Sequence, residues 1–564
     1  MKTGAQILCE SLVHEGVEVV FGIIGGAVLP MYDAFSEYPQ IRRVLVRHEQ
    51  AAAHAAAGYA RAMQKAGVCV ATSGPGATNL VTGIADAYMD STPLVVITGQ
   101  VGRSFIGKDT FQECDITGIT LPIIKHNYLV KDANDIARIV KEAFHIAQTG
   151  RPGPVLIDLP RDVQASMVEE SYPQEVSLPG YRPVYEAKPA DVAKAAEMLN
   201  KAERPAVLAG RGVILSRAYD ELEQLVETMQ APVVHTLLGL GSFPPQHYLN
   251  LGMIGMHGSG YANRAIQNAD LVLALGTRFG DRATMRTHDF ARSAVVVHVD
   301  IDPAEIAKNV TPFTSVIGDV KNVLTQLNPL VKSRDRSDWM SQIDKWRAGY
   351  PLSVHKSGGK LSAREVIRTI CRSADEHTII ATGVGQHQMF TAQEYASPRR
   401  NGLITSGGLG TMGFEVPSAL GAQVACPDET VWSIAGDGGF QMTLQELATI
   451  AQEDLPVKIA VLNNGYLGLV RQLQELYCRG NYVDVGLRTP DFVMLSKAYG
   501  IPAVRVETEE EVGAAIEQAL AHPGPFLIEF SVEPEENVFP IVAAGASLDE
   551  MTEGPVKVEE LGAA

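Results

Sequence analysis

The sequence has few cysteines and no pair of them that could share a metal ion. Its six cysteines lie far apart along 564 residues, and no two are spaced as CxxC. Such spacing supports neither a zinc site nor a disulfide framework. It is typical of a protein from a reducing compartment. We therefore expect neither a cysteine-ligated metal nor disulfide bonds.

Positive charge and long apolar runs are also scarce. Lysine and arginine total 47 against 65 aspartates and glutamates, a formal net charge of −18, which argues against a broad surface for nucleic acid or anionic membrane. No stretch approaches the ~20 apolar residues of a membrane span. The N-terminus spaces its apolar residues as an amphipathic helix and lacks the apolar core of a signal peptide. These features predict a soluble, cytoplasmic protein.

Short apolar segments alternate with amphipathic helical patterns along the chain. A chain of 564 residues is too long for one hydrophobic core, and two to four domains are expected. Several apolar segments show no polar alternation, as expected for parallel strands buried on both faces. Examples are VCVATSG, PLVVITGQ, LVLALGTRF, VWSIAGDG and VKIAVLNN. The pattern predicts the α/β class with three doubly wound parallel sheets.

Two stretches of different composition divide the chain into thirds. Residues 165–190 are rich in proline with little periodicity, and residues 333–360 are charged and end in SGGK, so both are expected to be connectors. The remaining chain ends in a polar, Glu-rich segment that we interpret as a tail or a lid. The predicted units are residues 1–165, 190–332 and 360–540, with a C-terminal tail over 541–564.

Polar residues follow two consecutive strands of the final third. VWSIAGDG ends with Asp437 between two glycines, and VKIAVLNN ends with Asn463 and Asn464. The carboxyl ends of such strands lie side by side where parallel sheets bind ligands. A carboxylate and an amide oxygen suit Mg²⁺ that shares its shell with phosphate oxygens, and glycines allow close backbone approach to phosphate. GDG alone would indicate a turn, but the pair resembles the fingerprint of thiamine-diphosphate enzymes.

A single carboxylate precedes a helix of small residues in the first third. Glu49 opens EQAAAHAAAGYARA. Thiamine chemistry needs one carboxyl group to hydrogen-bond N1′ of the aminopyrimidine, which favours the tautomer whose 4′-nitrogen removes the C2 proton. Burial would raise the pKa of that carboxyl group. A Glu at a helix start is more often a solvated cap, but its coexistence with GDG…NN favours catalysis. His48 and His54 are interpreted as packing or polar-network residues.

Two glycine-rich segments have simpler alternatives. SGPGATN is a Gly/Pro turn that opens a helix and suits backbone approach to a cofactor or a partner subunit, or it is a plain βα turn. GLGTMG (Gly408, Gly410, Gly413) matches the dinucleotide pattern GxGxxG. We expect no apolar strand before it and find no acidic residue in the required place, so we reject the dinucleotide interpretation. A turn beside the thiamine ring, with Met412 as an apolar wedge, is preferred.

Segments from every third together resemble the acetohydroxyacid (acetolactate) synthase large subunits of the thiamine-diphosphate superfamily. They include RHEQ, SGPGATN, DTFQECDITGI, GMHGSGYAN, RFGDR, HVDIDPAEI, TSGGLGTMGF and GDGGFQMTLQELATI, in order up to about Met551. The family implies a pyrimidine-binding first domain, a central Rossmann-like domain of FAD-binding type, and a third domain for thiamine diphosphate and Mg²⁺.

The resemblance also implies a reaction. Two 2-keto acids condense with loss of CO₂, giving 2-acetolactate from two pyruvates, or 2-aceto-2-hydroxybutyrate from pyruvate and 2-ketobutyrate. This is a step of isoleucine, valine and leucine biosynthesis. Alternatives are a FAD-independent catabolic acetolactate synthase, another thiamine-diphosphate decarboxylase or carboligase, and, more distantly, a non-catalytic paralogue.

The resemblance assigns roles to residues of the first and third domains. Glu49 is implied as the cofactor-activating carboxylate. Asp437 and Asn464 match the Mg²⁺ ligands, with the Tyr466 carbonyl as a third. Contacts to the diphosphate and the ring are implied at Val384, Gly385, Gln386, His387, Gly410, Met412, Gly438, Gly439 and Gly468.

Substrate and flavin positions follow in the same way. Phe111 and Gln112 match positions that line the substrate pocket. Arg282 matches the position that binds the second keto acid's carboxylate, which suits a bidentate guanidinium. FAD is implied as a structural cofactor, because the net reaction does not need it. Its implied contacts are Arg151, Gly210, Gly212, Thr236, Leu237, Met256, His257, Gly258, Gly276, Arg278, Asp300, Ile301, Asp319 and Val320.

The family implies partners, and the chain departs from the family at a few positions. The cofactor of the superfamily bridges the first domain of one chain and the third of another, so a homodimer is the minimum active unit; a small regulatory subunit is common. Ile23, Ile24, Gly280 and Phe390 replace typical family residues. Leu473 stands where the family typically has Trp, which puts the preference for 2-ketobutyrate in doubt and predicts weak binding of inhibitors that stack on that Trp.

Overall fold

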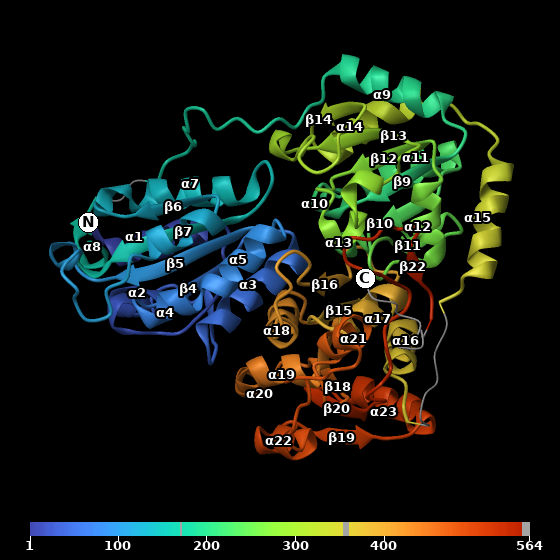
Figure 1. Cartoon of the computed structure of the whole chain (residues 1–564). Helices are drawn as coiled ribbons and strands as arrows, with labels where there is room; N and C mark the ends of the chain where they lie inside the picture. Colours follow the sequence, from blue (N-terminus) through green and yellow to red (C-terminus); the bar gives the residue numbers. More distant parts are fainter. Residues whose placement is uncertain (170–171, 353–359, 555–564) are drawn as a thin grey trace.

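Three six-stranded parallel sheets, each flanked by helices, form the chain (Figure 1). The computed structural model describes residues 1–169, 172–352 and 360–554. The apolar segments singled out in the sequence are all strands, and every pairing within the three sheets is parallel, so the predicted α/β class is confirmed. None of the helices in the described ranges is long and apolar enough to cross a bilayer.

The first sheet lies in the blue and cyan part of Figure 1. Its strands, in spatial order, are β3 (Arg42–Leu45), β2 (Val19–Gly22), β4 (Gly67–Ala71), β5 (Leu94–Gln100), β7 (Pro154–Pro160) and β6 (His126–Leu129). The helices that cover it are α1 (Gly4–His14), α2 (Leu29–Phe35), α3 (Glu49–Met63), α4 (Pro75–Asn79), α5 (Val81–Met89), α6 (Ile116–Thr120), α7 (Ile136–Gln148) and α8 (Arg161–Ala165). Strands β4, β5 and β7 are buried throughout, which explains their lack of alternation.

The middle sheet has the strand order of dinucleotide-binding folds, 3-2-1-4-5-6 when its strands are numbered from β9. The order is β11 (Asn250–Met253), β10 (Val233–His235), β9 (Pro205–Ala209), β12 (Leu271–Leu275), β13 (Val295–Asp300) and β14 (Thr314–Ile317). Its helices are α9 (Pro189–Lys201), α10 (Arg211–Leu215), α11 (Tyr219–Met229), α12 (Gly260–Gln267), α13 (Asp281–Thr284) and α14 (Val320–Leu327). The sequence-based expectation of a Rossmann-like middle sheet therefore holds.

A helix occupies part of the second expected connector. Helix α15 (Ser337–Gly349) lies within residues 333–360 and packs on the middle domain. Two of its side chains, Trp339 and Ile343, are buried four residues apart, and Trp339 Nε1 donates to Pro205 O at 3.0 Å. Because charged residues surround this short apolar stripe, the sequence pattern did not indicate a helix here. Residues 353–359 of the same stretch lie outside the described residues.

The third sheet repeats the strand order of the first. Its strands are β16 (Leu403–Thr405), β15 (Thr378–Thr382), β17 (Thr430–Gly436), β18 (Lys458–Asn463), β20 (Phe526–Ser531) and β19 (Ala503–Val506). Its helices are α16 (Ala363–Ser373), α17 (Gln386–Glu394), α18 (Glu415–Ala425), α19 (Asp437–Thr443), α20 (Leu447–Gln452), α21 (Gly468–Tyr477), α22 (Phe492–Ala498) and α23 (Glu509–Ala521). Contrary to expectation, a short strand, β16, does precede GLGTMG. The segment after β16 leads into α18 of the third domain.

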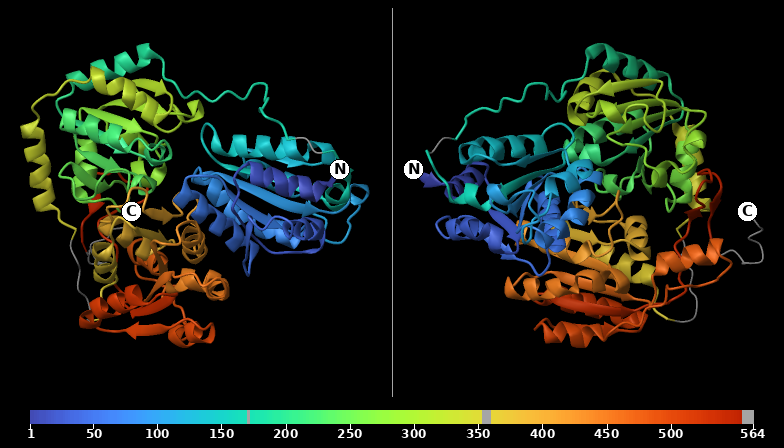
Figure 2. Two further views of the ribbon diagram at one scale, coloured as in Figure 1. Left: turned by 180° about the vertical axis from the view of Figure 1, so that it is seen from behind. Right: turned by 60° about the vertical axis from the view of Figure 1, so that its left-hand side comes forward.

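The first and third domains share one hydrophobic core. The buried cluster that contains the alanines of α3 continues into Phe414 and α18 without interruption, and the two helices lie against each other in Figures 1 and 2. A Cβ on Gly58 would collide with Ser418 O, and a Cβ on Gly421 would collide with Ala55 O. Only small residues allow backbones to approach this closely, so the Ala/Gly composition of α3 is explained by packing.

Two short antiparallel strand pairs lie outside the three sheets. Strand β1 (Lys2–Thr3) pairs with β8 (Met167–Val168), where the first expected connector begins. After the third sheet, β21 (Ile541–Val542) and β22 (Met551–Thr552) form an antiparallel pair. This part of the expected tail packs on the middle domain, because Val542 N donates to Met256 O at 2.8 Å. Residues 555–564 of that tail lie outside the described residues.

The close approach of α3 and α18 predicts a selective effect of added methyl groups. Gly421→Ala forces a Cβ into the Ala55 carbonyl and should cost about 2 kcal/mol or more of stability. Gly513→Ala is the matched control, because it lies in α23 with nothing within 4 Å of the added Cβ. It should stabilise by about 0.5–1 kcal/mol. The melting temperatures of the two variants and the wild type test this prediction. A G421A protein with the melting temperature of the wild type would contradict the close packing of α3 and α18.

Candidate active site

A pocket of about 180 Å³ lies at the carboxyl ends of β15 and β17. In the strand order of this sheet, the chain leaves β15 to opposite sides for β16 and β17. Such a switch point is where doubly wound sheets bind ligands. All the third-domain residues expected from the sequence line this one pocket: Val384, Gly385, Gln386, His387, Gly410, Met412, Asp437, Gly438, Gly439, Asn464, Tyr466 and Gly468. Phe390, one of the departures from the family, lines it as well.

Glycines give this pocket its shape. A Cβ on Gly468 would collide with Gln386 Oε1, and a Cβ on Gly436 would lie 2.9 Å from His387 Nδ1. Gln386 is itself held from two sides, since its Nε2 donates to Glu536 O at 2.9 Å and to Gln472 Oε1 at 3.2 Å. The backbone therefore forms much of the wall, as a diphosphate site requires.

Asp437, Asn464 and Tyr466 lie together at one end of this pocket. Asp437 is buried, and its Oδ2 accepts from Gly465 N at 3.0 Å. Burial raises the pKa of Asp437 to about 7, so the carboxylate lacks a compensating positive charge, which a bound cation would supply. Among the described residues no three His, Cys, Asp or Glu side chains cluster as a metal site. One carboxylate, one amide and one carbonyl instead fit a Mg²⁺ ion that takes its other ligands from phosphate and water.

Glu415, which the sequence analysis did not single out, lies behind this pocket. Its side chain is fully buried, and neither carboxyl oxygen has a hydrogen-bond partner within the described part of the chain. It packs against two glycines of the pocket region, touching the position of a Cβ on Gly383 and lying 2.6 Å from one on Gly439. Burial raises the pKa of Glu415 to about 7. A neutral carboxyl group is the form that such surroundings favour.

Glu49 lies elsewhere, at the corresponding switch point of the first sheet. The half-buried Glu49 begins α3, and its Oε2 accepts from Asn79 Nδ2 at 2.9 Å. Asn79 ends SGPGATN, and a Cβ on Gly76 of the same segment would lie 3.3 Å from Glu49 Oε1. This motif therefore does contact the expected catalytic carboxylate. Asn79 is a functional candidate that the sequence analysis missed, although it had marked the segment.

The two first-domain substrate candidates lie beside the same turn. Gln112 has a positive φ of 61° and packs against Gly74, whose Cβ would lie 3.0 Å from Gln112 Cα. Phe111 is 85% exposed. No described residue before Ala363 lines the smaller pocket. Within one chain, Glu49, Phe111 and Gln112 are thus not brought together with Asp437 and Asn464.

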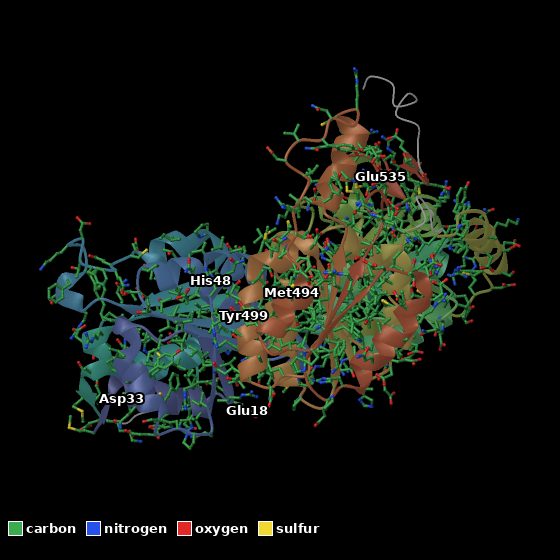
Figure 3. The ribbon with its side chains drawn as sticks, turned by 90° about the horizontal axis from the view of Figure 1, so that it is seen from below. Glu18, Asp33, His48, Met494, Tyr499 and Glu535 are labelled. Atoms are coloured by element: carbon green, nitrogen blue, oxygen red, sulfur yellow. The ribbon has the colours of Figure 1, made fainter. Side chains whose placement is uncertain are left out.

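The third domain nevertheless fixes the turn that leads to Glu49. The buried Glu446, just after α19, accepts from Arg47 N at 3.0 Å and from Thr449 Oγ1 at 2.7 Å. His48 follows Arg47 and lies at the boundary between the blue first domain and the orange third domain in Figure 3. Its Nδ1 accepts from Gln50 N at 3.1 Å and caps α3, while the buried His54 packs edge-on against Phe414.

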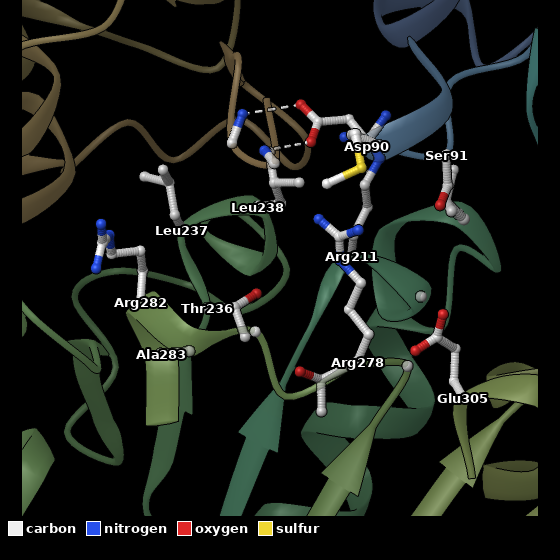
Figure 4. A pocket seen from close by; sticks show the side chains of 18 of the residues that line it. Asp90, Ser91, Arg211, Thr236, Leu237, Leu238, Arg278, Arg282, Ala283 and Glu305 are labelled. Atoms are coloured by element: carbon white, nitrogen blue, oxygen red, sulfur yellow. Dashed lines mark hydrogen bonds between the residues drawn. The ribbon is translucent and has the colours of Figure 1, made fainter. Parts of the chain in front are cut away.

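A larger cavity of about 830 Å³ lies between the domains at the switch point of the middle sheet, beyond β9 and β12 (Figure 4). Twelve of the fourteen expected flavin positions line it: Arg151, Gly212, Thr236, Leu237, Met256, His257, Gly276, Arg278, Asp300, Ile301, Asp319 and Val320. The other two are packing glycines. A Cβ on Gly210 would collide with Gly276 O, and one on Gly258 would lie 2.6 Å from Gly255 N.

The cavity has charged walls with unmet hydrogen bonds. Arg211 Nε is buried without a partner among residues 1–169, 172–352 and 360–554, and burial lowers the pKa of Arg211 to about 9. Arg151 is paired, donating to Glu305 Oε1 at 2.6 Å. Burial raises the pKa of Asp300 to about 6. A cavity of this volume, with the buried guanidinium of Arg211 and its unpartnered Nε on the wall, fits an anionic dinucleotide.

The two cavities meet at a common wall. Val384, Gly410 and Leu469 line both. Arg282 and Gly280 line the larger cavity. Leu473 is half-buried in α21 and lines neither of them.

Comparison with known proteins points to one family. Models of thiamine pyrophosphate enzymes match the chain three times: the N-terminal TPP binding domain over residues 2–119, the central domain over 192–327 and the C-terminal TPP binding domain over 383–530. An acetolactate synthase of Mycobacterium bovis is 49% identical over 564 residues, 97% of this chain and 91% of its own length. Acetolactate synthase large subunits of Corynebacterium glutamicum (47% identity; 97% and 89% covered) and Porphyra purpurea (46%; 98% and 95%) are similar.

The raised pKa of Glu415 predicts a pH-dependent stability. The unfolded side chain ionises near the ordinary glutamate pKa of 4.5, whereas the folded one stays neutral up to about pH 7. The neutral Glu415 therefore makes its full contribution to the free energy of unfolding below the unfolded-state pKa. That contribution, about 3 kcal/mol, is lost as the pH rises to the folded-state pKa. The wild-type melting temperature should fall relative to that of Glu415→Gln between about pH 5 and pH 7.

The control for this comparison is Glu517→Gln at an exposed position of α23. Its melting temperature should follow the wild type at every pH. A constant difference between wild type and E415Q across the same range would mean that Glu415 is not held neutral in the folded protein.

Proposed function

Because the chain belongs to the thiamine pyrophosphate enzymes, among the acetolactate synthase large subunits, we propose that it condenses two 2-keto acids with loss of CO₂. The products would be 2-acetolactate from two pyruvates and 2-aceto-2-hydroxybutyrate from pyruvate and 2-ketobutyrate, as in branched-chain amino-acid biosynthesis. The observation that carries the proposal is the assembly, in one pocket, of every third-domain residue expected for this family.

The smaller pocket would hold the diphosphate of the cofactor together with Mg²⁺. Asp437, Asn464 and the Tyr466 carbonyl would ligate the ion, and the glycine-lined wall would admit the phosphates. Bound thiamine diphosphate supplies an electron sink for the pair released on decarboxylation. Met412, which lines the same pocket, would support the ring as an apolar wedge.

Glu49 would act on this cofactor from a second copy of the chain. In one chain the first-domain cluster of Glu49, Asn79 and Gln112 contributes nothing to the smaller pocket, so each copy has half of a site. The 85% exposure of Phe111 beside Gln112 fits a surface that a partner covers. We therefore infer a homodimer as the minimum active unit. Glu49 would hydrogen-bond the pyrimidine ring, and Asn79 would orient its carboxylate.

The interdomain cavity would hold FAD. The strand order of the middle sheet, the glycines that bring α10 against Gly276, and the unpartnered Arg211 support a dinucleotide there. Arg282 lines the same cavity, and it would bind the carboxylate of the second keto acid. Since similar proteins are named large subunits, a small regulatory partner is also proposed.

Turnover of pyruvate by the purified chain tests the proposed function. With thiamine diphosphate, Mg²⁺ and FAD, the chain should form acetolactate, and omission of FAD from stripped protein should abolish the product. Undiminished acetolactate without FAD would move the assignment to the catabolic, flavin-independent type. Consumption of pyruvate without acetolactate would indicate a different 2-keto acid decarboxylase, and no consumption would contradict the proposal.

Replacement of Glu49 tests its role. Glu49→Gln preserves the shape of the side chain but removes the ionisable group, so the rate of acetolactate formation should fall by a factor of about 100 or more. The affinity for thiamine diphosphate, measured by calorimetry, should change much less. Exposed Glu18→Gln of the same domain is the control and should be fully active. An E49Q enzyme with half the wild-type rate would exclude the proposed role.

A further inference from the structure

The loop between β16 and α18 forms the wall between the two cavities. Residues Ser406 to Gly410 line the interdomain cavity, and Gly410 and Met412 line the smaller pocket. A shift of this loop would therefore change the shape of both. The third domain holds this loop through Gln388, whose Nε2 donates to Ser406 O at 2.8 Å, but further polar contacts run to the first domain.

Two aspartates of α5 and its cap bind the loop. Asp90 accepts from Gly407 N at 2.9 Å and from Gly408 N at 2.6 Å, the two contacts dashed in Figure 4. Asp86 Oδ1 accepts from Thr411 Oγ1 at 3.1 Å and from Ser406 Oγ. Together the two carboxylates thus bind the loop at Ser406, Gly407, Gly408 and Thr411.

Arg61 of α3 completes the cluster. Its Nη2 lies 2.9 Å from Asp90 Oδ2 and 3.7 Å from Asp86 Oδ2, and its Nη1 donates to Thr405 O, where the loop begins. The side chains of Arg61, Asp86 and Asp90 are at most 1% exposed. Hydrogen bonds of buried charged groups are strong and costly to lose, so the cluster fixes the loop firmly.

The cluster borders the ligand site of the interdomain cavity. Arg278 Nη2 would lie 2.5 Å from a Cβ on Gly408, and Asp90 Oδ1 would lie 2.9 Å from it. Arg211, with its unpartnered Nε, shares this wall and interacts electrostatically with both aspartates. An anionic ligand on these two arginines would therefore act directly on the residues that hold the loop.

We propose that Arg61, Asp86 and Asp90 are positioning residues that couple ligand binding in the interdomain cavity to cofactor binding in the smaller pocket. The proposal rests on the proposed function for the identity of the two ligands. A ligand that favours the ordered loop in one cavity raises the affinity of the other, and the effect is reciprocal. The flavin takes no part in the net reaction. The coupling gives it a thermodynamic role, because its binding strengthens the binding of thiamine diphosphate.

Calorimetric titration of cofactor-stripped protein tests the coupling. Thiamine diphosphate is titrated at saturating Mg²⁺, with and without saturating FAD, and FAD is titrated in the reverse experiment. In the wild type, FAD should lower the Kd for thiamine diphosphate about five- to tenfold, and thiamine diphosphate should lower the Kd for FAD by the same factor.

Thr411→Val is the decisive variant. Thr411 lines neither cavity, and valine keeps its shape while removing the bond to Asp86. The Kd for thiamine diphosphate should rise about fivefold, and the effect of FAD should shrink to less than about twofold. Thr411→Ser retains the hydroxyl and should restore both values. Asp90→Asn should act in the same direction more strongly.

Asp158→Asn is the matched control. Asp158 is a buried first-domain aspartate that accepts from Thr98 and Gln100, and as far as the structure describes the chain it makes no bond to the third domain. It should titrate as the wild type does, so an equal effect there would show general destabilisation and overturn the proposal. Wild-type binding of thiamine diphosphate that is indifferent to FAD, or no binding of FAD, would also overturn it. Wild-type protein that binds no thiamine diphosphate would instead refute the proposed function.

Discussion

The backbones of α3 and α18 approach so closely that a glycine on each helix faces a carbonyl oxygen on the other. The rest of the arrangement depends on this contact. Helix α3 has Glu49 at its first residue and Arg61 near its last, so its placement sets both the candidate catalytic carboxylate and the cluster that holds the third-domain loop. Glu446 adds a second fixed point, because it binds the turn just before Glu49. A helix that was free to tilt would misplace two sites at once.

One topological rule explains the location of all three candidate sites. The first and third sheets share a strand order, the middle sheet has that of dinucleotide-binding folds, and each sheet has its functional residues where the order reverses. This is why strand-end motifs could place Asp437 and Asn464 at one edge of the third sheet, whereas the other pocket residues came from the family resemblance. Asp437 and Asn464 follow adjacent parallel strands, and the register Gly436 to Leu462 brings their ends together. Such an inference needs only local sequence and a parallel sheet.

Other residues could not be found in this way. Asp86, Asp90 and Arg61 have the appearance of ordinary polar positions on helices, and their function depends on a loop more than 300 residues further on. Glu415 begins a helix, where a solvated carboxylate is the normal expectation, yet it is buried and packs against Gly383 and Gly439. Trp339 and Ile343 form too short a stripe to mark α15 among charged neighbours. Strand β16 has only three residues. In each case long-range packing decides, and a single sequence does not record it.

The shared core of the first and third domains also limits how such a chain can be rearranged during evolution. The middle domain meets the third across a cavity, through the tail and in a smaller buried cluster that includes Leu240 and Met253, whereas α3 and α18 interlock residue by residue. Recombination between homologous genes would therefore preserve folding when the outer two domains come from one parent and the central one from the other. Exchange of the first domain alone would pair helix faces that had never been selected together. The segments that must be inherited together are therefore those in contact in the folded protein, even where they are far apart in the gene.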